Sequence, residues 1–289
     1  MKGAKQLRRL LEKGELVVAP GVFNGLSAKL VEREGFNAVY LGGGLGVAGA
    51  MHGIPDVGII TLTEMVHAAM QILAASNLPL IVDADTGYGN PLNVRRTVTD
   101  FEEAGVAGIH LEDQPTPKRC GYYANVEVIS TEEMCAKVRA AVDAKTSKDF
   151  LIIARTDAIT TDGVDEAIYR GKKYYDCGAD MLFVNGVKTE AEVEKIAREL
   201  REIPQLYNVS ASGKAPDYSF SQFKELGFQI VIYPGHLVEV AAKSMVEFLG
   251  HLKTKGIAKG FASRMISFKE FTDILGLPEF TALQDKYKS

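Results

Sequence analysis

Acidic side chains stand at the ends of two neighbouring apolar runs of the sequence. Asp83 and Asp85 follow the run LPLIV, and His110 and Glu112 lie within the next run, GIHLED. Side chains two residues apart on a strand point to the same face, so each pair shares a face. Buried carboxylates repel one another unless a cation compensates their charge. We therefore expect a hard divalent cation here, Mg²⁺ or Mn²⁺ in its place, held by one or two direct carboxylates and retained waters. The alternative is that Asp83 or Glu112 caps a helix or pairs with Arg155.

A cysteine lies between cations on the long connection that follows the second acidic run. Cys120 stands in the tetrapeptide KRCG, next to Arg119 and close to Lys118. Adjacent cations favour the thiolate and lower the pKa of a thiol. We expect Cys120 to serve as a general acid or base on a lid that closes over substrate, with a purely space-filling cysteine as the alternative. Cys135 and Cys177, on helical segments, are assigned the space-filling role.

Other groups at the ends of apolar runs are suited to binding an anion. Arg155 presents a planar fork that fits a carboxylate or phosphate, and its alternative is an ion pair with Glu112 or Asp157. The glycines at 42–44 and 46 either bring backbone amides close to an anion or form only a tight turn. Further polar candidates at these ends are Asn185, Asn208, Ser210 and Tyr233, with Tyr122 and Tyr123 after the cysteine. His52 and His236 are expected to be structural.

These groups need a scaffold that brings many strand ends together. Short β-rich runs alternate with amphipathic helical runs, and they cover residues 16–21, 38–43, 78–85, 108–113, 150–158, 181–186, 205–210 and 229–235. Gly35, Gly105, Gly178 and Gly227 follow helical runs, as left-handed caps do. Eight β-then-α units predict an α/β fold of the (β/α)8 TIM-barrel type, whose chemistry lies at the carboxyl ends of the strands. A doubly wound open sheet is the alternative, but no glycine fingerprint follows the first strand.

We expect residues 1–289 to form a single domain, with the barrel over about 1–250 and a helical extension over about 251–289. The formal net charge is −4 and no long basic run occurs, which argues against nucleic acid as a partner. No apolar stretch approaches the roughly 20 residues that span a bilayer, and no signal-type apolar core is present, so no membrane partner is expected. Three cysteines, an odd number, indicate reduced thiols in a cytoplasmic protein.

The chain resembles the phosphoenolpyruvate mutase and isocitrate lyase superfamily from about residue 19 to residue 234. The motifs that carry the resemblance are APGVFNGLSAKL, GIPDVGIITLTEM, VDADTGYGN, GIHLEDQ, KRCG, IIARTDA, YNVS and IYP. The sequence is most similar to methylisocitrate lyase and to the related dimethylmalate lyase and oxaloacetate hydrolase types. Since the mutase branch lacks the cysteine of KRCG, the resemblance implies carbon–carbon cleavage rather than phosphoryl rearrangement.

The resemblance also implies a role for each matching residue. Three catalytic residues are implied, namely Cys120 as the lid acid that protonates an enolate, Arg155 as the ligand of the substrate carboxylate, and His110 beside the metal. The implied metal ligands are Asp85 directly, and Asp83, Glu112 and Asp56 largely through water. The implied substrate-binding residues are Leu41, Gly42, Gly43 and Gly44 in the loop that binds the 2-keto acid, with Lys118, Arg119, Gly121, Tyr122, Asn185, Asn208 and Tyr233. A homotetramer that exchanges its eighth helix between subunits is implied as well, and the terminal helices are compatible with it.

Three departures from the family pattern bear on the substrate. Tyr122 and Tyr123 stand where methylisocitrate lyases carry His and commonly Arg, and Asn185 stands where a Glu is usual. The loop GGGLG replaces one that begins with Ser-Gly. Because a cationic or imidazole group after the cysteine is missing, we expect a smaller or less charged 2-hydroxy acid, such as a substituted malate, in place of methylisocitrate.

We therefore expect a Mg²⁺-dependent lyase that cleaves a 2-hydroxy di- or tricarboxylate to a 2-keto acid and a carboxylate, by retro-aldol or Claisen-type cleavage. The alternatives are an oxaloacetate decarboxylase or hydrolase, phosphonopyruvate-type chemistry, and a catalytically silent protein that binds a 2-keto acid. A Schiff-base aldolase is disfavoured because no lysine stands at the end of a strand.

Overall fold

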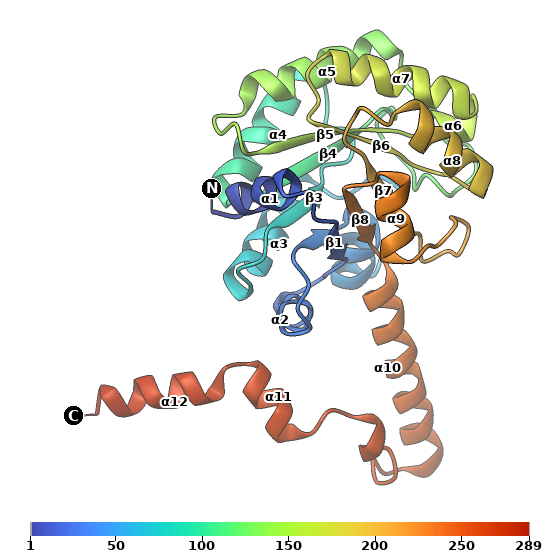
Figure 1. The fold of residues 1–289 in the computed structure, drawn as a ribbon. Coiled ribbons are helices and arrows are strands. Elements are labelled where there is room, and N and C mark those ends of the chain that lie inside the picture. The colour runs from blue at the N-terminus through green and yellow to red at the C-terminus, as the bar shows by residue number, and fades with distance from the viewer. Residues whose placement is uncertain (1, 289) are drawn as a thin grey trace.

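Eight parallel strands form the wall of a barrel in the computed structural model, which describes residues 2–288 (Figure 1). The strands are β1 (Val17–Pro20), β2 (Val39–Leu41), β3 (Leu80–Asp83), β4 (Gly108–Glu112), β5 (Leu151–Thr156), β6 (Met181–Val184), β7 (Leu206–Asn208) and β8 (Ile230–Tyr233). Each strand lies within one of the eight predicted runs, so the prediction of the strands is confirmed.

The strand pairing closes the wall. Strands β2 to β6 pair in chain order, and β8 lies between β1 and β7, in each case parallel. Two isolated parallel bridges, Gly21 with Tyr40 and Leu182 with Gln205, join these two groups of strands. The (β/α)8 barrel is therefore confirmed, and the alternative of an open doubly wound sheet is wrong.

Helices cover the outside of the barrel and begin and end at residues suited to those positions. They are α2 (Gly25–Arg33), α3 (Leu62–Ala75), α4 (Pro91–Ala104), α5 (Thr131–Ala144), α6 (Ala158–Thr161), α7 (Val164–Asp176), α8 (Glu190–Glu199) and α9 (Phe220–Leu226). Asn24, Thr61 and Asn90 each form a capping box at a helix start. Gly105 and Gly227 end α4 and α9 in the left-handed conformation, as predicted.

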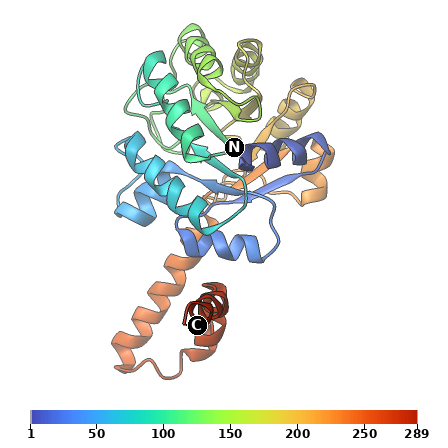
Figure 2. The ribbon, with the colours of Figure 1, turned by 90° about the vertical axis from the view of Figure 1, so that its left-hand side faces the viewer.

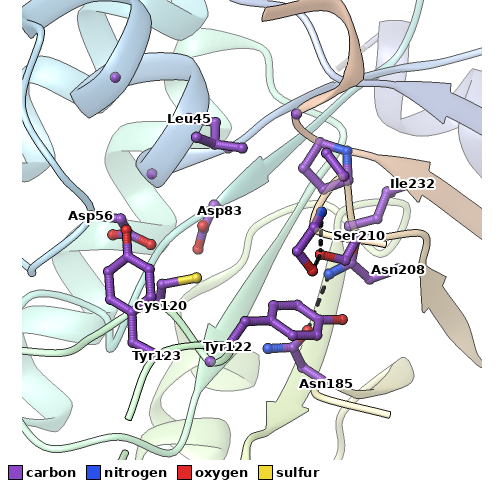
Figure 3. Close-up of a pocket in the computed structure, with 18 of the residues that line it drawn as sticks. Leu45, Asp56, Asp83, Cys120, Tyr122, Tyr123, Asn185, Asn208, Ser210 and Ile232 are labelled. Carbon is purple, nitrogen blue, oxygen red and sulfur yellow. Dashed lines mark hydrogen bonds between the residues drawn. The ribbon is translucent and has the colours of Figure 1, made fainter. Parts of the chain in front are cut away.

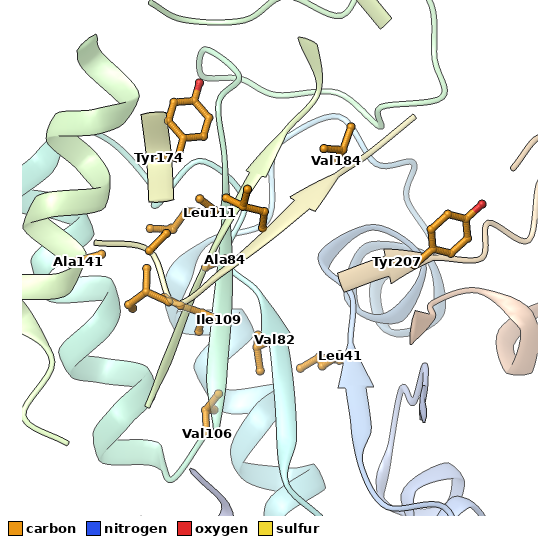
Figure 4. Close-up of a cluster of buried hydrophobic side chains, with 14 of the residues drawn as sticks. Leu41, Val82, Ala84, Val106, Ile109, Leu111, Ala141, Tyr174, Val184 and Tyr207 are labelled. Atoms are coloured by element: carbon orange, nitrogen blue, oxygen red, sulfur yellow. The ribbon is translucent and has the colours of Figure 1, made fainter. Parts of the chain in front are cut away.

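The apolar core has two layers, inside and outside the strands. The outer layer lies between strands and helices and includes Val82, Ile109, Leu111 and Tyr174 (Figure 4). The inner layer fills the barrel, where Ala4 and Leu7 of α1 (Lys2–Glu12) pack with strand residues such as Ile81. Helix α1 therefore contributes to the interior of the barrel, which the sequence analysis did not anticipate.

The chain leaves the barrel after the last strand. Helix α10 (His236–Lys255) has no buried residue, and it projects away from the barrel together with η2 (Ala262–Arg264), α11 (Phe268–Ile274) and α12 (Leu277–Lys286) (Figures 1 and 2). Helix α10 already separates from the barrel at its start. The expected division into a barrel and a helical extension near residue 250 stays a prediction. None of the helices within residues 2–288 is long and apolar enough to span a membrane.

Candidate functional site

A cavity of about 330 Å³ lies at the carboxyl ends of the strands. Ten predicted site residues line it, and they are Gly42, Gly44, Asp56, Asp83, Cys120, Gly121, Tyr122, Arg155, Asn185 and Asn208. Figure 3 shows Asp56, Asp83 and Cys120 at one end of the cavity, with Asn208, Ser210 and Ile232 at the other. Eight further predicted residues do not line the cavity, namely Leu41, Gly43, Asp85, His110, Glu112, Lys118, Arg119 and Tyr233.

The acidic residues at the mouth of the barrel converge on a cation. The Lys118 ammonium lies 2.7 Å from Asp56 Oδ1 and 2.9 Å from Asp85 Oδ1. Asp83 accepts hydrogen bonds from the backbone N–H groups of Asp85 and Gly43. A lysine that the sequence placed only on the lid is thus the direct partner of the two carboxylates.

Arg155 neutralises a second pair of carboxylates. Its guanidinium lies 2.9 Å from Glu112 Oε2 and 3.1 Å from Asp157 Oδ1. The alternative given for Glu112, pairing with Arg155, is therefore what the structure shows. Within residues 2–288, no three or more His, Cys, Asp or Glu side chains are gathered around one point as a metal site. Lys118 instead contacts the carboxylates of Asp56 and Asp85, and Arg155 contacts those of Glu112 and Asp157.

Carboxyl groups outnumber cations at this end of the cavity. The cluster contains the carboxylates of Asp56, Asp83, Asp85, Glu112 and Asp157, and only the cations Lys118 and Arg155. Burial raises the pKa of Asp85 to about 7. The repulsion of Asp83 and Asp56 adds to this rise, and the attraction of Lys118 opposes it. Burial likewise raises the pKa of Glu112 well above its ordinary value. These carboxylates are therefore under-compensated.

The donor atoms of this cluster fit a hard divalent cation. Asp85 Oδ1 and both Glu112 oxygens are buried and have no hydrogen-bond partner among the described residues, although Asp85 Oδ1 and Glu112 Oε2 lie within ion-pair distance of a cation. Two carboxylates already converge on the single Lys118 nitrogen, and the remaining donors are also oxygens. Mg²⁺ and Mn²⁺ prefer such oxygen ligands, so an ion that displaced the ammonium would find suitable ligands and compensate the carboxylates more fully.

His110 lies behind Asp83 and does not line the cavity. Its Nε2 atom is 2.8 Å from the Tyr40 hydroxyl, and its Nδ1 atom is 3.6 Å from Asp83 Oδ1. Burial lowers the pKa of His110 to about 4, although Asp83 opposes this. His110 Nδ1 makes no hydrogen bond to Asp83, and the imidazole is not among the residues that line the cavity.

Cys120 lies on the lid, residues 115–128, and its side chain faces the cavity. The prediction that neighbouring cations lower its pKa is wrong. Burial raises the pKa of the thiol, Asp56 adds to the effect, and Arg155 and Lys118 compensate only in part. The Lys118 ammonium lies against the carboxylates of Asp56 and Asp85, so it stabilises their charge more than that of a Cys120 thiolate. A neutral thiol at this position suits a general acid.

The glycine-rich segment forms the start of a helix, which the sequence analysis did not predict. Helix η1 (Gly43–His52) is a π-type helix that follows Gly42. A Cβ atom at Gly44 would come within 2.6 Å of Asp56 Oδ2, so only glycine leaves room for that carboxylate. The Gly43 backbone N–H donates a hydrogen bond to Asp83 Oδ2. The expected contact of these amides with an anion stays a prediction.

Polar groups from three elements form the far wall of the cavity. Asn208 Nδ2 donates a hydrogen bond to Asn185 Oδ1. Burial raises the pKa of Tyr122 to about 12, although a hydrogen bond with Ser210 opposes this rise. Several lining residues were not expected from the sequence, namely Tyr40, Leu45, Ile54, Phe183, Ser212, Lys214, Ile232, Pro234 and Glu239. Arg155 and Lys214 are the cations among the lining residues. Nothing in local sequence marks most of these residues, because they come from loops whose position depends on tertiary packing.

The chain is similar to proteins of known name along its whole length. The family model described as phosphoenolpyruvate phosphomutase matches residues 7–253. The 2,3-dimethylmalate lyase of Eubacterium barkeri is 42% identical over 287 residues, which cover 99% of each chain. The structure of oxaloacetate acetylhydrolase with 3,3-difluorooxalacetate is 35% identical, covers 100% of this chain and 98% of that one, and has a TM-score of 0.93. Phosphonopyruvate hydrolase with oxalate and Mg²⁺ is 29% identical, covers 100% of both chains and has a TM-score of 0.89.

Proposed function

Because the chain belongs to the phosphoenolpyruvate mutase and isocitrate lyase superfamily, we propose that it is a lyase that cleaves the C2–C3 bond of a substituted malate. The products are a 2-keto acid and a saturated monocarboxylate. The observation that carries this proposal is the position of Cys120, whose neutral thiol faces the same cavity as Arg155 and the acidic cluster. Carbon–carbon cleavage leaves a carbanion-like fragment, and a thiol at this place can protonate it.

The acidic cluster is the proposed site of Mg²⁺ or Mn²⁺. Asp85 would hold the ion directly, with Asp83, Glu112 and Asp56 around it, in the place that the Lys118 ammonium occupies. When bound, a divalent cation polarises the carbonyl that forms at C2. A similar structure, phosphonopyruvate hydrolase, was solved with oxalate and Mg²⁺, which supports this assignment.

The chain's own side chains bind the substrate and move one proton. Arg155, held in place by Glu112 and Asp157, is oriented to bind the carboxylate of the part that becomes the 2-keto acid. The C2 hydroxyl gives up its proton to solvent, its electron pair forms the C2 carbonyl as the C2–C3 bond breaks, and Cys120 Sγ donates its proton to C3 of the departing fragment. The thiolate then regains a proton from solvent. Tyr122 stays protonated below pH about 12, so it can donate a hydrogen bond to a substrate oxygen but does not serve as a base near neutral pH.

The charges that line the cavity favour a dicarboxylate over a tricarboxylate. Arg155 and Lys214 can each accommodate one carboxylate, and the Ser210 and Ser212 hydroxyls lie at the same end as Lys214. A third carboxylate would find no further cation among the lining residues and would meet Glu239. The apolar side chains of Leu45 and Ile232 suit alkyl substituents. Substituted malates are thus a better fit than methylisocitrate.

An assay of a substrate panel tests this proposal. The purified protein is incubated with Mg²⁺ or Mn²⁺ and with malate, methyl-substituted malates, 2-methylisocitrate, oxaloacetate or phosphonopyruvate, and the released 2-keto acid is measured as its phenylhydrazone. We expect the highest kcat/KM with an alkyl-substituted malate. Turnover of oxaloacetate alone, with acetate and oxalate as products, would instead establish the hydrolase alternative, which the high TM-score to oxaloacetate acetylhydrolase favours.

The C-terminal arm, residues 236–288, is the proposed site of assembly. Its helix α10 exposes Val240, Met245, Val246 and Leu249, and no helix within residues 2–288 covers the barrel after β8 (Figure 1). Exposed apolar residues of this extent are typical of a protein interface. We propose that α10 packs on the barrel of a second copy, in a homotetramer.

A further inference from the structure

The side chain of Gln114 joins the lid to the floor of the site. Gln114 follows β4 after one intervening residue and is 1% exposed. Its Oε1 atom accepts a hydrogen bond from the Arg119 backbone N–H at 3.0 Å, and its Nε2 atom donates to the Arg119 carbonyl at 2.9 Å. One amide group thus satisfies both polar atoms of the backbone that immediately precedes Cys120.

The second donor of the same amide reaches a carboxylate of the site. Gln114 Nε2 donates to Asp157 Oδ2 at 3.1 Å. The other oxygen of Asp157 accepts from Arg155 at 3.1 Å and from Asn185 at 2.6 Å. The Asp157 backbone is itself fixed, because its N–H donates to the buried carboxylate of Asp113. Gln114 therefore connects the lid to the carboxylate that orients Arg155.

The lid also packs against this carboxylate on the other side of Cys120. A Cβ atom at Gly121 would come within 2.4 Å of both Asp157 Oδ1 and Asn185 Nδ2. The lid backbone is consequently fixed before Cys120 by hydrogen bonds and after it by close packing. Cys120 lies between two anchored residues, and its sulfur faces the cavity (Figure 3).

We propose that Gln114 is a positioning residue that holds the lid closed and thereby sets Cys120 for proton transfer, in register with Arg155. The part of this inference that concerns proton transfer rests on the function proposed above, whereas the part that concerns lid closure does not. Loss of the amide would free the Arg119 backbone and one oxygen of Asp157 together. The lid and the carboxylate-binding arginine would then no longer be coupled.

The rate at which iodoacetamide alkylates Cys120 tests lid closure without any substrate. Peptide mass spectrometry separates Cys120 from Cys135 and Cys177. In Gln114→Met the lid loses the two hydrogen bonds that the Gln114 side chain makes to the Arg119 backbone, so we expect Cys120 to react about tenfold faster or more. Gln114→Glu, which keeps the acceptor for Arg119 N–H but places a carboxylate against Asp157, is a second variant should the first fail to fold. Gln205→Met is the matched control, since Gln205 is equally buried and donates to the Leu200 carbonyl far from the lid.

Turnover gives the second readout. We expect kcat of Gln114→Met to fall while KM stays within about twofold of the parent value. Because Gln114 acts through Cys120, Gln114→Met should lower kcat no further in a protein that already carries Cys120→Ser. An unchanged alkylation rate in both Gln114 variants, or equal acceleration in Gln205→Met, would overturn the inference. Faster alkylation combined with full turnover by Cys120→Ser would support lid closure by Gln114 and refute the proton-donor role instead.

Discussion

Replacing Cys120 by serine removes the proposed proton donor and changes little else. The side chain is only partly buried, and its neighbours on the lid are held by their backbones, so the substitution should alter the free energy of unfolding by less than about 1 kcal/mol. A serine hydroxyl is a far weaker acid than a thiol. Arg155 and the acidic cluster stay in place, so binding of the substrate should be preserved.

The expected loss is set by what a general acid contributes. Proton donation by a positioned side chain is worth about 10²–10⁴ in rate, or about 2.7–5.4 kcal/mol of transition-state stabilisation. We therefore predict that Cys120→Ser lowers kcat of substituted-malate cleavage by about 10²–10⁴ and changes KM by less than about threefold. The assay follows release of the 2-keto acid, and circular dichroism follows thermal unfolding of the same samples.

Cys135→Ser is the matched control for this substitution. Cys135 is buried on α5, where its sulfur faces the Lys173 carbonyl, and it does not line the cavity. Its replacement should lower the melting temperature by a few degrees, consistent with about 1 kcal/mol, and leave kcat unchanged. Turnover by Cys120→Ser within a few fold of the parent, or an equal loss in Cys135→Ser, would refute the reasoning.

Three further predictions follow from the charges and contacts described. Burial raises the pKa of the Cys120 thiol, so its acid form persists as pH rises. We therefore expect kcat to stay constant beyond the ordinary thiol pKa of about 8.5 and to fall only at higher pH. A fall in kcat that is already complete at about pH 8 would contradict this. Tyr174→Phe removes a hydroxyl that donates to the buried Asp113 carboxylate at 2.8 Å, so it should lower the free energy of unfolding by about 1–3 kcal/mol. The control is Tyr169→Phe on the same helix, where the Tyr169 side chain is half exposed, and it should lower that free energy by less than about 0.5 kcal/mol. Both values are measured by unfolding in urea. Val246→Glu with Leu249→Glu should dissociate the assembly in light scattering while Glu247→Gln should not; an unchanged mass in the double variant would argue against α10 as the interface.

The sequence was sufficient to predict the scaffold and the acidic residues of the site. Strand alternation with helices is a local pattern, and the barrel follows from its repetition, so all eight strands and the convergence of Asp83, Asp85, Glu112 and Arg155 could be expected. The carboxylates were correctly expected to need compensation. Which cation provides it in the structure could not be read from the same pattern.

What sequence reasoning missed depends on loops and on distant contacts. Lys118 and Gln114 act through the fold of the lid over the strand ends, and the identities of neighbours along the chain do not encode that fold. The shift in the pKa of Cys120 was predicted with the wrong sign because burial of the thiol, which raises its pKa, outweighs the attraction of Arg155 and Lys118. The resemblance implied an eighth helix exchanged between subunits, but nothing local in the sequence shows that α10 turns away from the barrel.

Direct measurement of Mn²⁺ binding tests the central claim that the acidic cluster is a divalent-cation site. Electron paramagnetic resonance counts free Mn²⁺ during titration of the full-length protein, without substrate and without reference to activity. We predict one Mn²⁺ per chain, competed by Mg²⁺, with binding lost in Asp85→Asn and retained in Asp165→Asn, an exposed carboxylate paired with Lys195 on the helical layer. A parent protein that binds no Mn²⁺, or an Asp85→Asn variant that binds it as tightly as the parent, would contradict the claim.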